Sequence, residues 1–210
     1  MLSLLQKAGA KATFFLSGVR VAAYTELVAD IIGAGHAVYG HAWEHVNLGL
    51  FPPSHALEAM RRVEDLLARL RPTPSPYLIR LPYNAGYKTA AMHRAMGRFH
   101  PDVHFAYHTL STEDYLLAEG CGEDHGMLKA RCQAKAGELC AHPSLPGSII
   151  LMHENPFDCR GELVPVIAET LLPPLLEGIT ARGLQCGLIR TTAPHRQLDR
   201  FLLLKVMGRR

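Results

Sequence analysis

Residues 36–48 read HAVYGHAWEHVNL, a stretch that joins a short apolar run to a cluster of polar residues. The first five residues, 36–40, follow a helix-like segment, so we predict a strand there. His41 and His45 come directly after that strand, four residues apart, with Glu44 beside the second histidine. In sheets and barrels of parallel strands, functional groups collect at the carboxyl ends of the strands. The stretch therefore predicts a strand that delivers two histidines to a site.

Apolar runs and helix-like segments alternate along the rest of the chain as well. We predict strands over residues 11–17, 36–40, 77–83, 103–110, 147–154 and 184–190. We predict helices over residues 22–34, 55–70, 87–97 and 162–181, with Ser54 capping the second and Pro173 and Pro174 interrupting the last. Strands that alternate with helices in this way indicate an α/β fold with parallel strands.

Composition and charge narrow the class of protein. The chain has 210 residues, of which 48% are hydrophobic, so it can bury the core of one folded domain. The net charge of +3 with mixed signs gives no reason to expect a nucleic-acid partner. No apolar run is long enough to span a bilayer, and the first residues lack the pattern of a signal peptide. The cellular compartment and the oligomeric state stay open.

The five cysteines are compatible with two chemical states. They are Cys121, Cys132, Cys140, Cys159 and Cys186, and they include no CxxC pair, which argues against a zinc ribbon. A disulfide formed in an oxidising compartment and buried free thiols fit this spacing equally well.

The two histidines suggest a metal site, and the glutamate between them suggests a competing one. Neutral imidazoles bind zinc and similar ions, and a separation of four residues lets both rings point one way on a helix or a tight turn. A chance pair is the alternative, because the chain has 12 histidines. His41, Glu44 and His45 also match the HxxEH pattern of inverted-zincin metalloproteases, in which the glutamate is the general base. That pattern needs a long helix, whereas Gly40 precedes it and two prolines follow soon after.

Three more predicted strands end in polar residues. Arg80 and Tyr83 end one strand, Asp114 follows the next and His153 ends a third. An arginine there can tune a carboxylate, an aspartate can orient a histidine, and a histidine can act as a general acid. Each also has an ordinary interpretation, as a surface salt bridge, a turn residue or a core histidine respectively. We favour a shared site, because four strand ends offer polar groups to the same face.

Taken in order, the segments from about residue 5 to residue 192 resemble the polysaccharide deacetylase family, the NodB-homology domain of carbohydrate esterase family 4. GAKATFFLSG resembles the family's strand after the opening helix, and GHAVYGHAWEHVNL resembles its H-(S/T)-x-x-H-P motif, with Ala42 and Val46 at the Ser/Thr and Pro positions. RLPYN resembles R-x-P-Y, and ILMHE resembles L-x-H. HTLSTEDY resembles D-x-x-D-W, with Ser111 at the first Asp and Tyr115 at the Trp.

The resemblance implies a fold, a cofactor and a set of roles. The fold would be a deformed (β/α) barrel of NodB type, and the cofactor a divalent metal, usually zinc, with His41 and His45 as two of its ligands. Arg80 matches the arginine that holds the catalytic base. Tyr83 matches the residue whose backbone N–H helps to bind the oxyanion.

The later motifs imply the remaining roles. Asp114 and His153 match an aspartate–histidine pair in which the histidine is the general acid. Leu151 matches the leucine that lines the acetyl pocket. Tyr115 follows the aspartate and can form an aromatic wall of a sugar-sized pocket.

Residues 1–210 contain no T-F-D-D-G, the motif that supplies the family's general base and third metal ligand. We therefore expect a barrel that is incomplete at its N-terminus, without the first strand. Three explanations stay open: the chain start is mis-assigned or truncated, the protein has kept only a carbohydrate-binding or structural role, or another carboxylate, Glu44 or Glu154, acts as the base.

The resemblance predicts a metal-dependent hydrolase that removes N-acetyl or O-acetyl groups from an acetylated polysaccharide or oligosaccharide. A non-catalytic carbohydrate-binding or relic domain is the first alternative, and an inverted-zincin protease is the second. We expect residues 1–192 to form the deacetylase-like domain and residues 193–210 to form a basic, amphipathic tail. From residues 1–210 alone we expect little acetate release, because the general base is missing from them.

Overall fold

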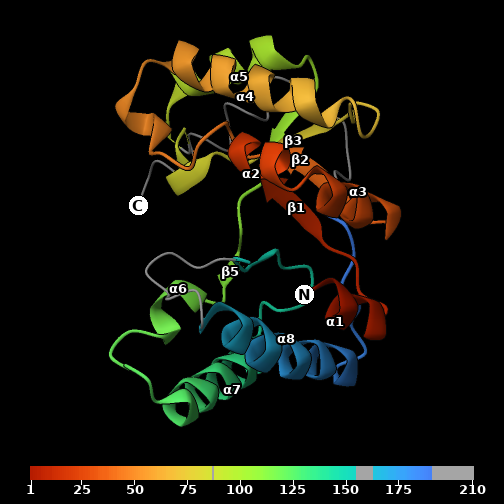
Figure 1. The fold of residues 1–210 in the computed structure, drawn as a ribbon, viewed down its shortest axis with the longest axis vertical. Coiled ribbons are helices and arrows are strands. Elements are labelled where there is room, and N and C mark those ends of the chain that lie inside the picture. Colours follow the sequence, from red (N-terminus) through yellow and green to blue (C-terminus); the bar gives the residue numbers. More distant parts are fainter. Residues whose placement is uncertain (87, 155–162, 191–210) are drawn as a thin grey trace. The chain divides into compact units, whose positions relative to one another are not determined.

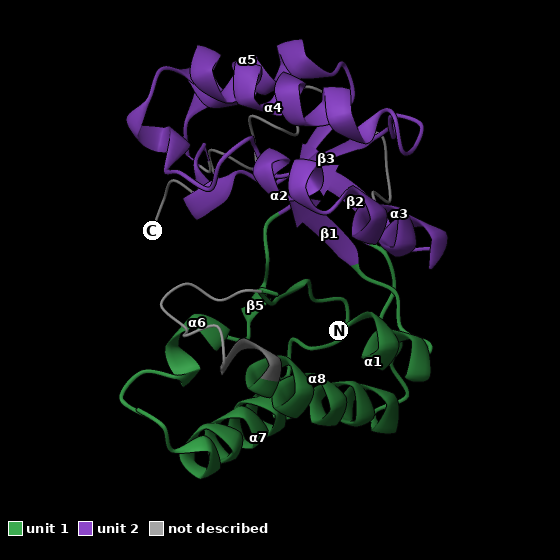
Figure 2. Ribbon diagram, in the orientation of Figure 1, with its two compact units in different colours: residues 1–12, 107–188 green, residues 13–106, 189–210 purple. Residues whose placement is uncertain are grey.

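The computed structural model describes residues 1–86, 88–154 and 163–190. The chain forms two compact units, coloured separately in Figure 2. Unit 1 comprises residues 1–12 and 107–188, and unit 2 comprises residues 13–106 together with those from 189 onward. The tail predicted over residues 193–210 lies outside the described residues, and the assignment of residues 1–192 to one domain stays a prediction.

Unit 2 is built from strands followed by helices (Figure 1). Its strands are β1 (Thr13–Leu16), β2 (Ala37–Gly40), β3 (Tyr77–Ile79) and β4 (Val103–Phe105). β1 pairs with β2 and β3 pairs with β4, in both cases in parallel. Its helices are α2 (Gly18–Ala23), α3 (Thr25–Gly33), α4 (Pro53–Leu67) and α5 (Ala90–Phe99), with 3-10 turns η1 (Leu48–Leu50) and η2 (Pro82–Asn84). The strands predicted over residues 11–17 and 36–40 are confirmed, and the strand predicted over residues 77–83 is confirmed for Tyr77–Ile79 only, since Pro82–Asn84 form η2.

Helix α4 shows how the sequence pattern builds unit 2. Its buried residues recur at helical spacing and form one face: Ala56, Leu57, Met60, Val63, Glu64 and Leu67. The helix begins at Pro53, not after the predicted cap Ser54, and Pro52 is its N-cap. A proline suits the first helical position because its φ is already helical and the N–H it lacks would have no partner within the helix.

Unit 1 is mainly helical. It contains α1 (Leu2–Lys7), α6 (Asp114–Leu117), α7 (His125–Ala141) and α8 (Leu163–Ala181), and the short parallel pair β5 (Leu110–Ser111) and β6 (Ile150–Leu151). Figure 1 shows α7 and α8 side by side. Their facing residues form one core cluster: Leu128, Cys132, Ala136 and Leu139 of α7, and Ile167, Leu171, Leu175 and Ile179 of α8. The spacing of three to four residues on each helix is what buries one continuous stripe.

Two predicted helices differ in the structure. The segment 22–34 belongs to two helices, α2 and α3, which meet at Tyr24, where a φ of −132° interrupts the helical backbone. Pro173 and Pro174 do not interrupt α8, which runs through them. The apolar stripe of α8 packs on α7 across this point, and such packing supplies most of the stability of helices in proteins. No helix in the described part of the chain is long and apolar enough to cross a membrane.

Two predicted strands also differ. The apolar run 103–110 gives β4 and β5, which pair with different strands in different units. Residues 184–190 form no strand. This segment makes only isolated backbone contacts with the start of the chain: the Lys11 N–H donates to the Cys186 carbonyl at 3.1 Å, and the Ile189 N–H donates to the Thr13 hydroxyl at 3.1 Å.

Candidate functional site

The residues predicted for the site fall into two groups, one in each unit. Unit 2 holds His41, His45, Arg80 and Tyr83, and unit 1 holds Asp114, Tyr115, Leu151 and His153. Within each unit the structure brings residues together that are far apart in the sequence. That the two groups face one site stays a prediction.

In unit 2, His41 is held at its backbone and at its ring. Its N–H donates to the Leu16 carbonyl of β1 at 2.8 Å, and its ring Nδ1 lies 2.7 Å from the Arg80 carbonyl oxygen. A carbonyl oxygen can only accept, so Nδ1 carries the proton and the lone pair of the neutral ring is on Nε2. Histidines that bind metals commonly use their second nitrogen in this way. His41 therefore fits a ligand that binds through Nε2.

The chain turns between His41 and His45, and the two rings come close together. Ala42 makes the turn with a left-handed backbone (φ 63°) and is fully buried. The ring centroids of His41 and His45 are 5.1 Å apart, and the rings are inclined at 50°. Tyr83 lies beside them, with its ring centroid 5.0 Å from that of His45. Two imidazoles at this separation can contribute to one divalent-metal site.

The geometry of this loop separates the two metal hypotheses. Residues 41–47 form no helix, whereas the inverted-zincin pattern needs both histidines on one helix. The protease alternative therefore has no structural support. In the part of the chain that the structure describes, no group of three His, Cys, Asp or Glu side chains is arranged to hold a metal ion. Of the described residues, His41 and His45 could supply two of the ligands of a metal site.

Arg80 and Tyr83 follow β3 and lie next to the histidines. The Arg80 carbonyl accepts from His41, and its guanidinium donates from Nη1 to the Ala106 carbonyl at 3.4 Å. Tyr83 has a left-handed backbone (φ 56°) and is 60% exposed. Tyr83 therefore presents its ring to solvent beside His45.

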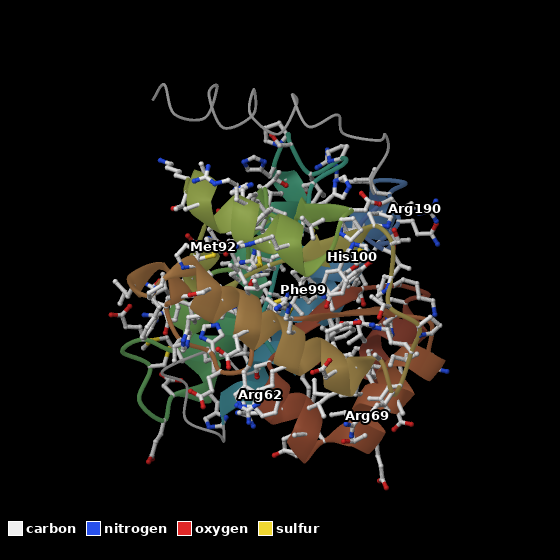
Figure 3. The ribbon with its side chains drawn as sticks, turned by 90° about the horizontal axis from the view of Figure 1, so that it is seen from above. Arg62, Arg69, Met92, Phe99, His100 and Arg190 are labelled. Atoms are coloured by element: carbon white, nitrogen blue, oxygen red, sulfur yellow. The ribbon has the colours of Figure 1, made fainter. Side chains whose placement is uncertain are left out.

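Sequence reasoning missed a buried polar network behind the histidine loop. Glu64 on α4 accepts two hydrogen bonds from Arg71, at 2.9 and 3.0 Å, and one from the Tyr77 hydroxyl at 2.7 Å. The Tyr77 ring packs edge-on against that of Phe99, with centroids 4.9 Å apart; Phe99 is the last residue of α5 and is labelled in Figure 3. Burial, and next the charge of Glu64, raise the pKa of Tyr77, so this side chain stays a neutral donor. The signal was present in the sequence: Glu64 occupies a position on the apolar face of α4, where a carboxylate needs a buried partner.

In unit 1, a buried carboxylate orients His153. Asp114 is fully buried, and its two oxygens accept from the His153 ring Nδ1 at 2.8 Å and from the His153 backbone N–H at 2.5 Å. The Tyr115 N–H also donates to Asp114, at 3.1 Å. Because a carboxylate anion can only accept, Nδ1 of His153 is protonated and the lone pair of the neutral ring is on Nε2. The structure thus joins two motifs that are 39 residues apart.

Tyr115 and Leu151 lie around this pair. The Tyr115 ring stands nearly perpendicular to the His153 ring, at 81°, with centroids 5.9 Å apart. Leu151 is in β6, two residues before His153, and its carbonyl accepts from the Thr112 N–H at 3.0 Å. Both residues are therefore positioned by the same backbone that positions the aspartate and the histidine.

Two carboxylates were predicted as substitute bases, and the structure places them in different units. Glu44 is exposed in the histidine loop of unit 2. Glu154 follows His153 in unit 1; the residue is exposed, yet neighbouring protein atoms partly desolvate its carboxyl group and raise its pKa. A raised pKa makes a carboxylate a stronger base.

Among the described cysteines, Cys121 and Cys132 belong to the core of unit 1, and Cys140 and Cys186 pack against it. Cys121, Cys140 and Cys186 are free thiols, and Cys132 is fully buried among the helices. Cys159 lies outside the described residues. For three of the five cysteines the structure therefore favours the thiol state over the disulfide.

The sequence of the chain is similar to that of known polysaccharide deacetylases. Residues 1–98 match the family model described as polysaccharide deacetylase. A chitin deacetylase from Arthroderma benhamiae is 24% identical over 188 residues, which is 88% of this chain and 45% of that protein. A chitin deacetylase from a Pestalotiopsis species is 31% identical over 86 residues, 40% of this chain and 28% of that protein. The resemblance to the polysaccharide deacetylase family is confirmed.

The chain spans less than half the length of these two chitin deacetylases. Among solved structures, a family 4 carbohydrate esterase from Streptomyces lividans has a TM-score of 0.70 at 20% identity, over 92% of this chain and 86% of that one. A polysaccharide deacetylase from Bacillus cereus has a TM-score of 0.67 at 22% identity, over 91% and 85%. The predicted α/β fold of NodB type is therefore confirmed.

One similar structure is described as that of a family 4 pseudoenzyme. This protein from Bacillus anthracis has a TM-score of 0.65 at 20% identity, over 90% of this chain and 57% of that one. The polysaccharide deacetylase fold is thus shared by proteins that are called deacetylases and by one that is called a pseudoenzyme.

Proposed function

We propose that the chain carries two parts of a carbohydrate deacetylase site: a divalent-metal site at His41 and His45, and a general acid at His153. The substrate would be an acetylated polysaccharide or oligosaccharide. One observation carries the proposal: His41 and His153 are each held through Nδ1, by a carbonyl and by a carboxylate, which places the lone pair of each neutral ring on Nε2.

Imidazole ligands suit zinc among other divalent metals, and a bound zinc ion would polarise the acetyl carbonyl and lower the pKa of a bound water. His41 would hold the ion through Nε2, and Arg80 would keep the His41 ring in the correct tautomer through its carbonyl oxygen. The backbone N–H of Tyr83 would donate to the oxyanion that forms on the acetyl group.

His153 would complete the reaction by giving a proton from Nε2 to the leaving group. Asp114 keeps the His153 ring in one orientation, and it would stabilise the positive charge of the ring when both nitrogens carry a proton. Leu151 and Tyr115 would provide apolar and aromatic walls for the acetyl group and the sugar. The chain departs from the family at the base, because residues 1–210 contain no T-F-D-D-G.

The direct test is acetate release from chitooligosaccharides and from peptidoglycan fragments with added Zn²⁺. We expect slow release that a chelator abolishes, because general-base catalysis contributes on the order of 10²–10⁴ in rate and its usual residue is missing from these residues. The His153→Ala variant should lower the rate further, by a similar factor, since the general acid is removed. Release that is indifferent to the chelator and to His153→Ala would contradict the proposal.

A carbohydrate-binding role without catalysis is the second candidate function. It is supported by the absence, among the described residues, of a third metal-binding side chain beside His41 and His45. In the same assay this role would appear as chitooligosaccharide binding without acetate release, also after the addition of a metal.

A further inference from the structure

Two backbone groups on the edge of β2 that faces away from β1 are bonded by side chains. In a parallel strand the backbone groups of successive residues point to alternate edges. The His41 N–H points to β1, where it donates to the Leu16 carbonyl. On the other edge, the Arg71 Nε donates to the Val38 carbonyl at 2.8 Å, and the Gly40 N–H donates to the Tyr77 hydroxyl at 3.2 Å. Arg71 and Tyr77 thus occupy the positions that a neighbouring strand would otherwise fill.

Both side chains are fixed by one carboxylate. Glu64 accepts from Arg71 through both of its oxygens, and from the Tyr77 hydroxyl and the Thr73 hydroxyl at 2.7 and 2.9 Å. Glu64 is 9% exposed and Tyr77 is fully buried. Burial works against the charge of Arg71, but the hydrogen bonds and the charge of Glu64 outweigh it and leave the pKa of Arg71 raised. The network is therefore a charge-balanced unit in which each group has a partner.

This network is attached to the residue that precedes the proposed metal ligand. Gly40 has no side chain, and a Cβ there would come within 2.5 Å of Val63, so the end of β2 lies directly on α4. Tyr77 opens β3, and Arg80 follows β3 and accepts from the His41 ring. β3 and its flanks thus hold Gly40 and His41 at two points, the Tyr77 hydroxyl and the Arg80 carbonyl.

We propose that Tyr77, fixed by Glu64 and Arg71, is a positioning residue that sets the orientation of His41 for metal binding. The proposal rests on the proposed function, in which His41 is a metal ligand. The Tyr77 hydroxyl fixes the Gly40 peptide, and the Gly40 peptide fixes where the His41 ring meets the Arg80 carbonyl. Losing the hydroxyl leaves the buried Gly40 N–H and one oxygen of Glu64 each without this partner, and a buried donor without a partner moves toward one.

The test compares Tyr77→Phe with Tyr39→Phe in the full chain. The two rings contact each other, with centroids 5.3 Å apart, and both residues are buried, so each variant removes one hydroxyl from the same cluster. Of these two hydroxyls, it is that of Tyr77 that accepts from the Gly40 N–H. In the metal-free protein we expect Tyr77→Phe to speed hydrogen exchange of the Gly40 amide by on the order of tenfold, the factor that one lost buried hydrogen bond gives. Nitrogen-15 spectra should show His41 losing its single Nδ1–H tautomer, and Tyr39→Phe should change neither signal.

A Co²⁺ titration followed by absorption then links the network to the metal. Loss of a group that orients a ligand typically weakens metal binding by about 10–100-fold, and we expect this for Tyr77→Phe and not for Tyr39→Phe. Met96 is a fully buried residue of α5, so Met96→Ala creates a cavity and controls for a general loss of stability. This variant should leave the His41 tautomer unchanged. Arg71→Lys should resemble Tyr77→Phe in part, because the single nitrogen of lysine does not reproduce the three guanidinium nitrogens that bond Val38 and the two oxygens of Glu64.

The results separate the two proposals. If wild-type protein binds no Co²⁺, the proposed metal site is wrong, and the metal-free spectra still decide the role of Tyr77. If Gly40 exchange and the His41 tautomer are the same in Tyr77→Phe and Tyr39→Phe, the positioning role is wrong. An equal change in Met96→Ala would also overturn it, because the effect would then be general loosening.

Discussion

Asp114 is a fully buried carboxylate in unit 1. It accepts from three N–H donors, two of them on His153 and one on Tyr115. In Asp114→Asn one of the two acceptor oxygens becomes an NH₂ group, which must face an N–H in either orientation. We expect a loss of about 1–3 kcal/mol in the free energy of unfolding and a shift of His153 away from the Nδ1–H tautomer. Urea unfolding and nitrogen-15 spectra measure the two effects.

Asp102→Asn is the matched control for this change. Asp102 also bonds a histidine, His104, but its side chain is 47% exposed, and exposed pairs contribute little to stability. We expect a change of less than about 1 kcal/mol in the control. Equal losses in the two variants would show that the hydrogen bonds of Asp114 contribute no more to stability than an exposed pair does.

The raised pKa of Tyr77 leads to a prediction of how the free energy of unfolding depends on pH. Its pKa is raised in the folded protein, whereas an unfolded tyrosine ionises near pH 10. Between these two values the unfolded chain releases a proton that the folded chain keeps, so this contribution is fully present below roughly pH 10 and is lost as the pH rises further. Denaturation midpoints measured from pH 9 upward should fall less steeply for Tyr77→Phe than for wild type. Parallel slopes would show that Tyr77 ionises normally in the folded protein.

At the scale of elements, the N-terminus of α2 supports the histidine loop. The N–H groups of Gly18 and Val19 donate to the carbonyls of Ala42 and Trp43, at 2.9 and 3.1 Å. The Trp43 ring lies under the guanidinium of Arg62, which is 3.5 Å from the ring centroid and is labelled on α4 in Figure 3. A Cβ on Gly18 would come within 2.2 Å of the Trp43 ring. The close approach of α2 to this loop therefore requires glycine.

We expect Gly18→Ala to destabilise the protein by about 1–3 kcal/mol and to displace Trp43. Trp43 is the only tryptophan, so its fluorescence reports the displacement directly, and chemical unfolding gives the stability. Gly33→Ala, at the end of α3, meets open space and should be neutral or stabilising by up to about 1 kcal/mol. A Gly18→Ala protein with wild-type fluorescence and stability would contradict this account of the loop.

Strands and helices could be predicted where the sequence pattern within the segment determines them. They could not be predicted where a segment distant in the sequence determines which strand pairs with which. The run of residues 36–40 is apolar and ends at Gly40, so its strand is found from sequence. The run 103–110 looks like one strand, yet the Ala106 N–H still bonds the Ile79 carbonyl while the Thr109 N–H bonds the Ile149 carbonyl, in the other unit. No local signal marks that change of partner.

At the scale of the whole molecule, the order of the motifs predicted the fold. Five short motifs in sequence order indicated the NodB type, and structures with TM-scores of 0.70 and 0.67 over more than nine-tenths of the chain confirm it. The network of Glu64, Arg71 and Tyr77 was not predicted. Its members lie on a helix, in a turn and in a strand, and only the tertiary fold brings them to the edge of β2.

Calorimetric titration of the full chain with Zn²⁺ tests the central claim most directly. We predict one zinc ion per chain, with binding weakened at least about tenfold in His41→Ala and in His45→Ala, because each removes a ligand. His104→Ala is the control: His104 is a partly buried histidine paired with Asp102, and its loss should leave the titration unchanged. No zinc binding by wild-type protein, or binding that both His41→Ala and His45→Ala retain in full, would contradict the account.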